Sequence, residues 1–212
     1  MRPEAHVDIA QAVVHGHEIT RHAALSLEGG SIHALSMGIG LPRLWSMAAG
    51  AALRGFARGV TAVQGAARGR LDAGLAQAQI EVTRLREGLV EVLTLDATLL
   101  AVVLEGEHLH VMCVGPARAY LHRGAKPRRL TPREDPDRAL LGGSATHCET
   151  PIQPGDLILA GSVSAFSVPA IGRLASVLDA DPTTPPSVLA SLLTEPAAKA
   201  GVGAVAAVLR IR

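Results

Sequence analysis

The sequence predicts an α+β fold in which two antiparallel sheets are flanked by antiparallel helix pairs. Strand patterns fill residues 7–40, the apolar period becomes helical from Pro42 to Gly88, and strand patterns return from Thr94. Strands and helices that are segregated along a chain are typical of α+β domains, because each apolar helix stripe must be buried against a sheet. No linker, repeat or low-complexity tract divides the chain, so we expect residues 1–212 to form a single domain.

The first strands are predicted by short runs of mixed or alternating polarity. They cover residues 7–14, 22–27 and 31–36, and the last run leads into Met37-Gly38-Ile39-Gly40. The tripeptide Glu28-Gly29-Gly30 separates the second run from the third. Glycine adopts positive φ at little cost, so this tripeptide predicts a hairpin turn.

Two long helices are predicted at Pro42–Arg58 and Leu71–Gly88. Proline suits the first position of a helix, and apolar residues then recur at helical spacing. The second segment has one apolar stripe, with Arg and Glu on the opposite face. The glycines in residues 59–69 predict a joint between them, and small Ala and Gly side chains favour close antiparallel packing.

The remaining segments predict a strand meander, two short helices and a last strand. Turns at residues 105–107, 123–125 and 154–156 separate several of these strands. The predicted strands are residues 97–104, 109–114, 118–122, 128–131, 146–150, 157–161 and 204–211. Short helices are predicted at residues 169–178 and 187–193, and a polar loop at residues 131–141.

Composition excludes several classes of function. The 212 residues carry a net charge of +1 and only one Trp, one Tyr and two Phe, which argues against a nucleic-acid partner. Cys113 and Cys148 are too few for a disulfide framework and are expected to be buried free thiols. No apolar run reaches the roughly 18–20 residues of a membrane-spanning helix, and the amino terminus has no secretory signal pattern. We therefore expect a cytoplasmic protein without membrane insertion.

Three segments together resemble one enzyme family. The stretch from Ala97 to Thr131 contains Val114-Gly115, Arg118-Ala119-Tyr120-Leu121, Gly124 and Leu130-Thr131. It is similar to the V-G-D-S-R-x-Y-L hairpin and L-T of metal-dependent protein phosphatases of the PPM (type 2C-like) family. IQPGDLILAGSVSAF resembles the G-D-x-L-L-L-x-S-D-G-L segment of that family, ALSMGIGLP resembles its V-A-D-G-M-G-G, and the carboxyl-terminal residues resemble its last strand. The resemblance implies a PPM-phosphatase-like sandwich.

The resemblance also implies a particular chemistry. The family binds a pair of Mg²⁺ or Mn²⁺ ions, which are hard cations that prefer oxygen ligands. The ions activate a water for in-line attack on a phosphoserine or phosphothreonine ester and clamp the phosphoryl oxygens. Aspartates bridge the two ions, and without these carboxylates two divalent cations close together would repel each other.

This chain departs from the family at each metal-ligand position. Met37, or Ser36 in a register shifted by one, replaces the aspartate of D-G-M-G-G. Val163 replaces that of S-D-G and Pro116 that of G-D-S-R, while the terminal D-N falls at Val202-Gly203 or a neighbouring apolar pair. The early acidic pair should fall in residues 20–24, where there is no carboxylate. The positions of the vestigial family site are Met37, Gly38, Gly40, Pro116, Ser162, Val163 and Gly203. The expectation is no catalytic residue and no metal ligand.

Other constellations point to chemistry less strongly. His15-x-His17 and His108-x-His110 each place two imidazoles on one face of a strand, but the sequence places no third ligand. His147-Cys148 lacks a base and an orienting group for a cysteine nucleophile. Ser162 and Ser164 lack the G-x-S-x-G elbow of serine hydrolases. Asp156 matches the family's P-G-D turn, in which the aspartate caps the turn.

A cluster of cations in one hairpin predicts either a solvated face or a docking edge. Its members are Arg118, Arg123, Lys126, Arg128, Arg129 and Arg133. Glu134, Asp135 and Asp137 follow closely and offer compensating charge. As a docking edge, the cluster would suit an acidic or phosphorylated protein partner.

The sequence therefore predicts a pseudophosphatase: a PPM-like domain without a metal centre that binds a protein partner in bacterial signalling or assembly. One alternative is a divergent Mg²⁺- or Mn²⁺-dependent phosphatase that uses other acids, such as Asp8, Glu18, Asp96, Glu134 or Asp135. Another is a purely structural subunit of an oligomer. The sequence leaves the partner, the pathway and homo-oligomer formation open.

Overall fold

The computed structural model describes residues 7–16, 20–89, 94–124, 126–133 and 139–212. The strands are β1 (Val7–Val14), β2 (His22–Leu27), β3 (Ile32–Gly40), β4 (Leu95–Ala97), β5 (Leu99–Glu105), β6 (His108–Val114), β7 (Ala117–Arg123), β8 (Lys126–Arg129), β9 (Thr146–Pro151), β10 (Leu157–Ser162) and β11 (Ala204–Ile211). The α-helices are α1 (Trp45–Ala62), α2 (Ala67–Glu87), α3 (Val168–Ala180) and α4 (Pro186–Lys199), and short 3-10 turns are η1 (Glu28–Gly30), η2 (Pro42–Leu44) and η3 (Val163–Phe166).

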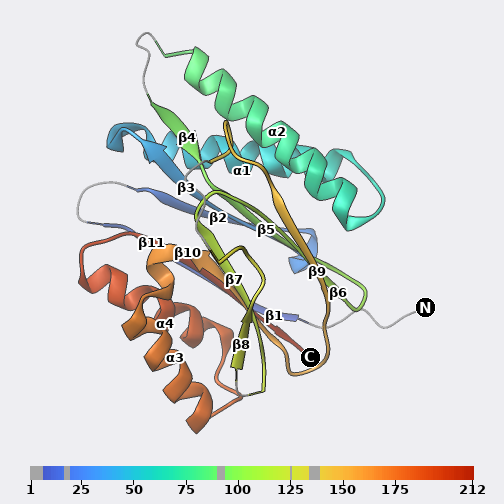
Figure 1. The fold of residues 1–212 in the computed structure, drawn as a ribbon, viewed down its shortest axis with the longest axis vertical. Helices are drawn as coiled ribbons and strands as arrows, with labels where there is room; N and C mark the ends of the chain where they lie inside the picture. Colours follow the sequence, from blue (N-terminus) through green and yellow to red (C-terminus); the bar gives the residue numbers. More distant parts are fainter. Residues whose placement is uncertain (1–6, 17–19, 90–93, 125, 134–138) are drawn as a thin grey trace.

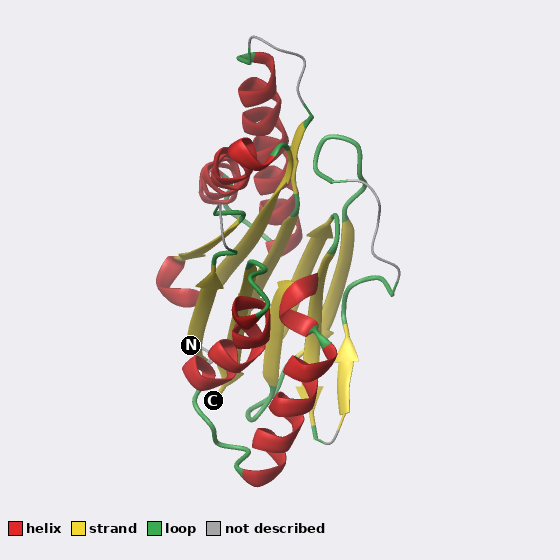
Figure 2. Cartoon of the chain, turned by 90° about the vertical axis from the view of Figure 1, so that its left-hand side faces the viewer, coloured by secondary structure: helices red, strands yellow, loops and turns green. Residues whose placement is uncertain are grey.

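The strands form two antiparallel sheets. One sheet has the order β1-β11-β10-β7-β8 and the other β2-β3-β5-β6-β9, with β4 paired to the end of β3. Helices α1 and α2 lie on one side of the strands and α3 and α4 on the other (Figure 1), and the view turned by 90° also places both helix pairs outside the strands (Figure 2). The predicted α+β sandwich with flanking helix pairs is confirmed.

The strand alternation distributes apolar residues to both faces of each sheet. The core between the sheets includes Leu35, Val111, Leu121 and Val205. A second cluster lies between α1, α2 and the β3–β5–β6 face, and a third between α3, α4 and the β10–β11 face. Burial on both faces explains why the central strands have nearly continuous apolar runs.

The predicted joint between the two long helices is present but shorter than expected, at residues 63–66. Helix α1 continues to Ala62 and α2 begins at Ala67, so most of residues 59–69 are helical. A Cβ atom on Gly59 would lie 2.3 Å from the carbonyl oxygen of Ala73, and one on Gly55 would lie 2.5 Å from that of Gln77. These glycines therefore allow the two helix backbones to cross closely, rather than ending the helices.

Other differences concern element ends and one thiol. Helix α4 runs six residues beyond the predicted end at Leu193, and β8 spans Lys126–Arg129 rather than residues 128–131. Cys113 is a buried free thiol as predicted, whereas Cys148 is only half-buried because its strand, β9, is a sheet edge. Part of the predicted polar loop lies outside the described residues. Of the helices that the structure describes, none is both long and apolar enough to span a bilayer.

Candidate functional site

The vestigial site positions come together at one end of the sandwich. Met37, Gly38 and Gly40 are the last residues of β3, and Ser162 and Val163 stand at the junction of β10 and η3. Gly203 precedes β11, and the Ser164 hydroxyl donates a 2.8 Å hydrogen bond to the Gly203 carbonyl oxygen. In the sequence these residues lie in separate segments. The pairing of the strands in the two sheets brings them close together.

Thr98 connects the end of β3 to the turn that contains Pro116. The Met37 N–H donates to the Thr98 hydroxyl at 3.0 Å, and the Thr98 N–H donates to the Met37 carbonyl at 2.9 Å. Gly115 lies against the Thr98 side chain, since a Cβ atom on Gly115 would be 2.9 Å from the Thr98 Cγ2 atom. Pro116 thus follows a turn that packs beside Met37, where the resembled family has an aspartate.

His22 is a site residue that the sequence reasoning missed. It lies directly opposite Met37 in the β2–β3 ladder and is only 3% exposed. A Cβ atom on Gly203 would lie 2.7 Å from its Nδ1 atom. Neither ring nitrogen has a hydrogen-bond partner among the described residues. One feature of the sequence could have pointed to His22. Residues 20–24, where the resembled family has an acidic pair, contain no carboxylate but do contain this histidine.

The environment of His22 keeps its imidazole neutral. Burial, together with the nearby charges of Arg21 and His15, lowers the pKa of His22 to about 4. Arg21 is itself fixed, because its Nε atom donates to the Gly38 carbonyl at 3.0 Å and its guanidinium lies 4.5 Å from the Trp45 ring centroid. A cation at this end of the sandwich is therefore already present in the protein.

The stability of the protein should fall as the pH is lowered from about 6.5 to about 4. Below pH 6.5 the unfolded chain protonates His22 while the folded protein does not, so proton uptake favours unfolding. The contribution of His22 reaches about 3 kcal/mol by pH 4. The measurement is urea unfolding of the native chain and of His22→Asn between pH 7.5 and 4.5. The other histidines contribute equally in the two proteins, so the difference in pH dependence reports His22. Equal pH dependence in the two proteins would contradict this assignment.

The two serines beside the site are occupied by local hydrogen bonds. The Ser162 hydroxyl accepts from the Val205 N–H at 3.2 Å and lies 2.9 Å from the Ser164 hydroxyl. Ser164 in turn donates to Gly203. These bonds join η3 to the start of β11, which gives both serines a structural role.

The donor set at the vestigial site does not fit a pair of Mg²⁺ or Mn²⁺ ions. These cations need several oxygen ligands and carboxylates to offset their charge. The positions in question present a thioether at Met37, aliphatic side chains at Val163 and Pro116, and no side chain at Gly203. Over the described ranges, no group of three or more His, Cys, Asp or Glu side chains could hold a metal ion.

The alternative acids that the structure describes have other partners. Asp8 pairs with Arg212 at the opposite end of β1 from the site. The Asp96 carboxylate accepts from the Ala97 N–H at 2.7 Å and from the Leu141 N–H at 3.2 Å, and burial raises the pKa of Asp96. Glu18, Glu134 and Asp135 lie outside the described residues.

The predicted basic edge is divided between two faces. Arg128 stands opposite Leu121, which faces the core between the sheets, and its guanidinium donates to the Thr150 hydroxyl. Arg129 stands opposite Tyr120 on the outer face and donates to the Arg133 carbonyl at 3.0 Å. Arg118 lies on the same face of β7 as Tyr120, two residues along.

Arg123 is committed to a buried carboxylate. Its Nε and Nη2 atoms donate to Asp156 at 2.7 and 2.6 Å, and this carboxylate raises the pKa of Arg123. Asp156 also accepts from the Gln153 N–H at 2.9 Å, so it caps the P-G-D turn as the resemblance implied. Arg123 therefore has a structural role. The side chain of Lys126, another member of the predicted basic edge, lies outside what the structure describes.

The remaining sequence candidates fall in different places. His15 is exposed beside the vestigial site, and its partner in the motif, His17, lies outside the described residues. His147 lies 3.3 Å from Asp72 of α2, and burial lowers the pKa of His147. The neighbouring Cys148 side chain packs on the core between the sheets, away from that pair. The His108-x-His110 pair stands at the β5–β6 turn.

Solved structures with the same fold cover nearly the whole chain. PppA, described as a key regulatory component of T6SS in Pseudomonas aeruginosa, has a TM-score of 0.81 and 18% identity over 97% of this chain and 98% of that one. The catalytic domain of the serine/threonine protein phosphatase PstP, in complex with two manganese ions, gives 0.78 and 20% over 97% and 98%. The PPM Ser-Thr phosphatase MsPP from Mycobacterium smegmatis, in complex with cacodylate, gives 0.76 and 22% over 96% and 98%.

These likenesses show that the chain has the PPM-phosphatase fold. No protein-family model and no curated protein matches it by sequence.

Proposed function

We propose that this chain is a catalytically inactive PPM-type phosphatase-like domain that acts as a protein-binding or scaffolding module. The observation that carries the proposal is the composition of the vestigial site. Met37, Val163, Pro116 and Gly203 replace the carboxylates of the resembled family, and the buried neutral His22 lies among them. A domain that keeps the PPM fold but lacks the metal ligands would act through its surface, by binding another protein.

Phosphoester hydrolysis of the family type needs a metal-activated water. A neutral imidazole and a thioether cannot hold two hard cations close together, because neither carries negative charge to offset their repulsion. Arg21 lies nearby and adds positive charge. The same residues that fill this end of the sandwich would therefore oppose metal binding.

A protein partner in bacterial signalling or assembly fits this role. PppA, which has the same fold, is described as a regulatory component of T6SS. The partner would be acidic or phosphorylated. It would dock on the basic edge through Arg118 and Arg129, on the outer side of β7 and β8, and through Arg133 in the segment that follows β8. Charge-assisted hydrogen bonds from arginine to carboxylate or phosphate would provide the recognition.

Titration with Mn²⁺ or Mg²⁺, combined with a para-nitrophenyl phosphate assay, tests the inactive state. We expect no saturable heat of binding and no metal-dependent turnover by the native chain. The variant Met37→Asp/Val163→Asp is also expected to stay inactive, because its other ligand positions still lack carboxylates. Tight Mn²⁺ binding with turnover by the native chain would instead establish a divergent phosphatase that uses other acids.

A further inference from the structure

We propose that the outer face of the α1–α2 helix pair binds an acidic amphipathic helix of a partner protein. This helix-pair surface is formed by Met47, Arg54 and Arg58 of α1 and by Ile80 and Arg84 of α2. It is separate from the basic edge, because α1 and α2 pack on the sheet that contains β3, β5 and β6, whereas β7 and β8 belong to the other sheet. The inference therefore does not rest on the proposed function.

The sequence already shows an uneven distribution of charge in this region. Residues 29–71 contain five arginines and no carboxylate, and α1 itself contains two arginines and no acidic residue. Arg54 precedes Arg58 by four residues and follows Met47 by seven, so all three lie on one side of α1. All three are exposed, and Met47 remains 45% exposed although it is a large apolar side chain.

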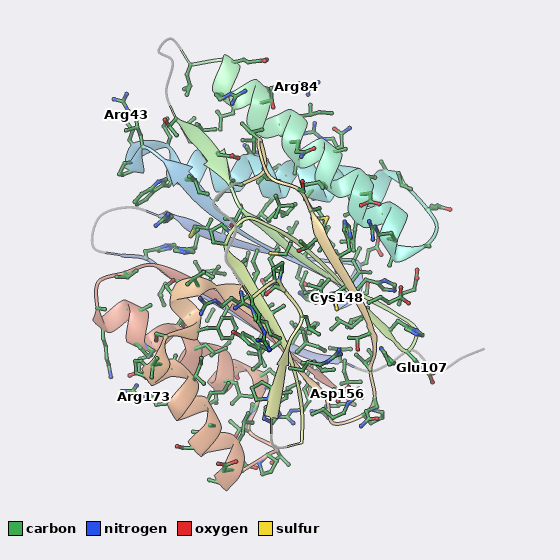
Figure 3. All side chains as sticks on the ribbon, in the orientation of Figure 1. Arg43, Arg84, Glu107, Cys148, Asp156 and Arg173 are labelled. Carbon is green, nitrogen blue, oxygen red and sulfur yellow. The ribbon has the colours of Figure 1, made fainter. Side chains whose placement is uncertain are left out.

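Helix α2 extends this surface. Ile80 is 40% exposed and stands one turn before Arg84, whose side chain is 67% exposed. The Arg58 guanidinium reaches Glu81 of α2 at 2.9 Å, so the exposed side chains of the two helices meet above their crossing. Figure 3 labels Arg84 on α2 and Arg173 on α3 at opposite sides of the molecule. The surface is therefore also remote from the second helix pair.

The helix-pair surface has an excess of positive charge. Arg58 and Arg84 share one carboxylate, that of Glu81, at 2.9 and 3.0 Å. Arg54 has neither an ion pair nor a hydrogen bond with any residue that the structure describes. Three guanidinium groups thus accompany a single carboxylate. A partner that brings carboxylates would supply the missing negative charge, and the planar fork of arginine matches carboxylate geometry.

The second helix pair has no such excess. Arg173 of α3 and Lys199 of α4 both pair with Glu195. Residues 168–199 contain only these two cations and three carboxylates, the other two being Asp179 and Asp181. The excess of arginine therefore belongs to the α1–α2 pair and is not a general property of the exposed helices in this chain.

The exposed apolar side chains favour a protein partner over other polyanions. Met47 and Ile80 can contact the apolar side of an amphipathic helix while the arginines pair with carboxylates on its flanks. Methionine is unbranched and adapts to the shape of a partner. The five residues of the surface include no aromatic ring on which a base could stack, and the net charge of the chain is only +1. A nucleic acid would therefore fit this surface poorly.

Fluorescence anisotropy with a synthetic peptide and the full chain tests the proposal. The probe is a helical peptide of about 15 residues, roughly four turns, with Leu along one side and Glu on both flanks. A second peptide with Lys in place of Glu is the charge control. We expect saturable binding of the acidic peptide alone, weakened about tenfold when the salt concentration rises from about 0.05 to 0.5 M.

Substitutions locate the binding surface. Arg54→Gln and Arg84→Gln should each weaken binding about threefold, and the double variant about tenfold. Met47→Ser should also weaken binding about threefold, through the loss of apolar contact. Arg173→Gln is the matched control, because it removes an exposed arginine from a helix on the other side of the molecule, and it should bind like the native chain.

Absence of acidic-peptide binding by the native chain would overturn the proposal. So would binding that is unchanged in Arg54→Gln/Arg84→Gln, or tighter binding of a DNA duplex or of phosphatidylglycerol vesicles at the same arginines. Loss of binding in Arg133→Gln, with Arg54→Gln unaffected, would place the peptide on the basic edge instead. Circular dichroism of each variant separates loss of contacts from loss of fold. The Mn²⁺ and phosphatase assays report on the vestigial site, so the two proposals can fail separately.

Discussion

Replacement of Gly38 by alanine is expected to destabilise the protein by about 4 kcal/mol or more, a large fraction of the stability of an ordinary domain. A Cβ atom at this position would lie 2.2 Å from the carbonyl oxygen and 2.5 Å from the Cα atom of Trp45. Both are backbone atoms at the start of α1, so the clash can be relieved only if the helix moves away from β3. Urea unfolding, followed by the fluorescence of Trp45, the only tryptophan, measures the loss.

Gly172→Ala is the matched control. Gly172 lies on the exposed side of α3, and nothing is within 4 Å of a Cβ atom there. Alanine has the higher helix propensity, so this variant should gain up to about 1 kcal/mol. A Gly38→Ala protein that unfolds at the native urea concentration would refute the close approach of β3 and α1.

Loss of Arg123 is expected to cost more than loss of its partner, Asp156. The Asp156 side chain is 1% exposed and the Arg123 side chain 40% exposed. Arg123→Ala leaves a carboxylate buried without its counterion, at a cost of about 3 kcal/mol. Asp156→Ala leaves a guanidinium that water can reach, so it should cost about 2 kcal/mol, which includes the lost cap on the Gln153 N–H.

A double-mutant cycle in urea separates the pair from its surroundings. The double variant should lose less stability than the two single variants combined, with a coupling energy of at least about 1 kcal/mol. Asp8→Ala provides the control, because its pair with Arg212 is largely exposed and should contribute less than about 1 kcal/mol. Equal losses in Arg123→Ala and Asp8→Ala would show that burial does not strengthen the Arg123–Asp156 pair.

These predictions explain why the family-like motifs are only partly kept. The fold requires both Gly38 and Asp156. Gly38 allows the backbone of β3 to approach that of α1, and Asp156 caps the turn before β10. Aspartates at Met37 and Val163 would serve only a metal. Under the proposed function, a chain without metal binding can lack these aspartates and still fold, whereas the motif glycine and the turn aspartate are needed for folding.

Local patterns in the sequence were enough to predict most of the fold. The predicted bounds of β1, β2 and β11 agree with the structure, because the alternation of apolar side chains has a short period that can be read within one segment. The pattern was misleading at Gly59, which belongs to α1 rather than to the joint. Gly59 serves a contact with Ala73 of α2, 14 residues further along the chain, and no local period encodes that contact.

The sequence by itself determined the α+β sandwich and the absence of carboxylates from the positions that resemble metal ligands. Only the tertiary structure decided that His22 lies buried opposite Met37 and against Gly203, and that Arg123 pairs with Asp156. Residue types and their periodicity can be read directly from the sequence. The partners that these residues meet depend on strand register and on the packing of distant segments, which only the folded chain fixes.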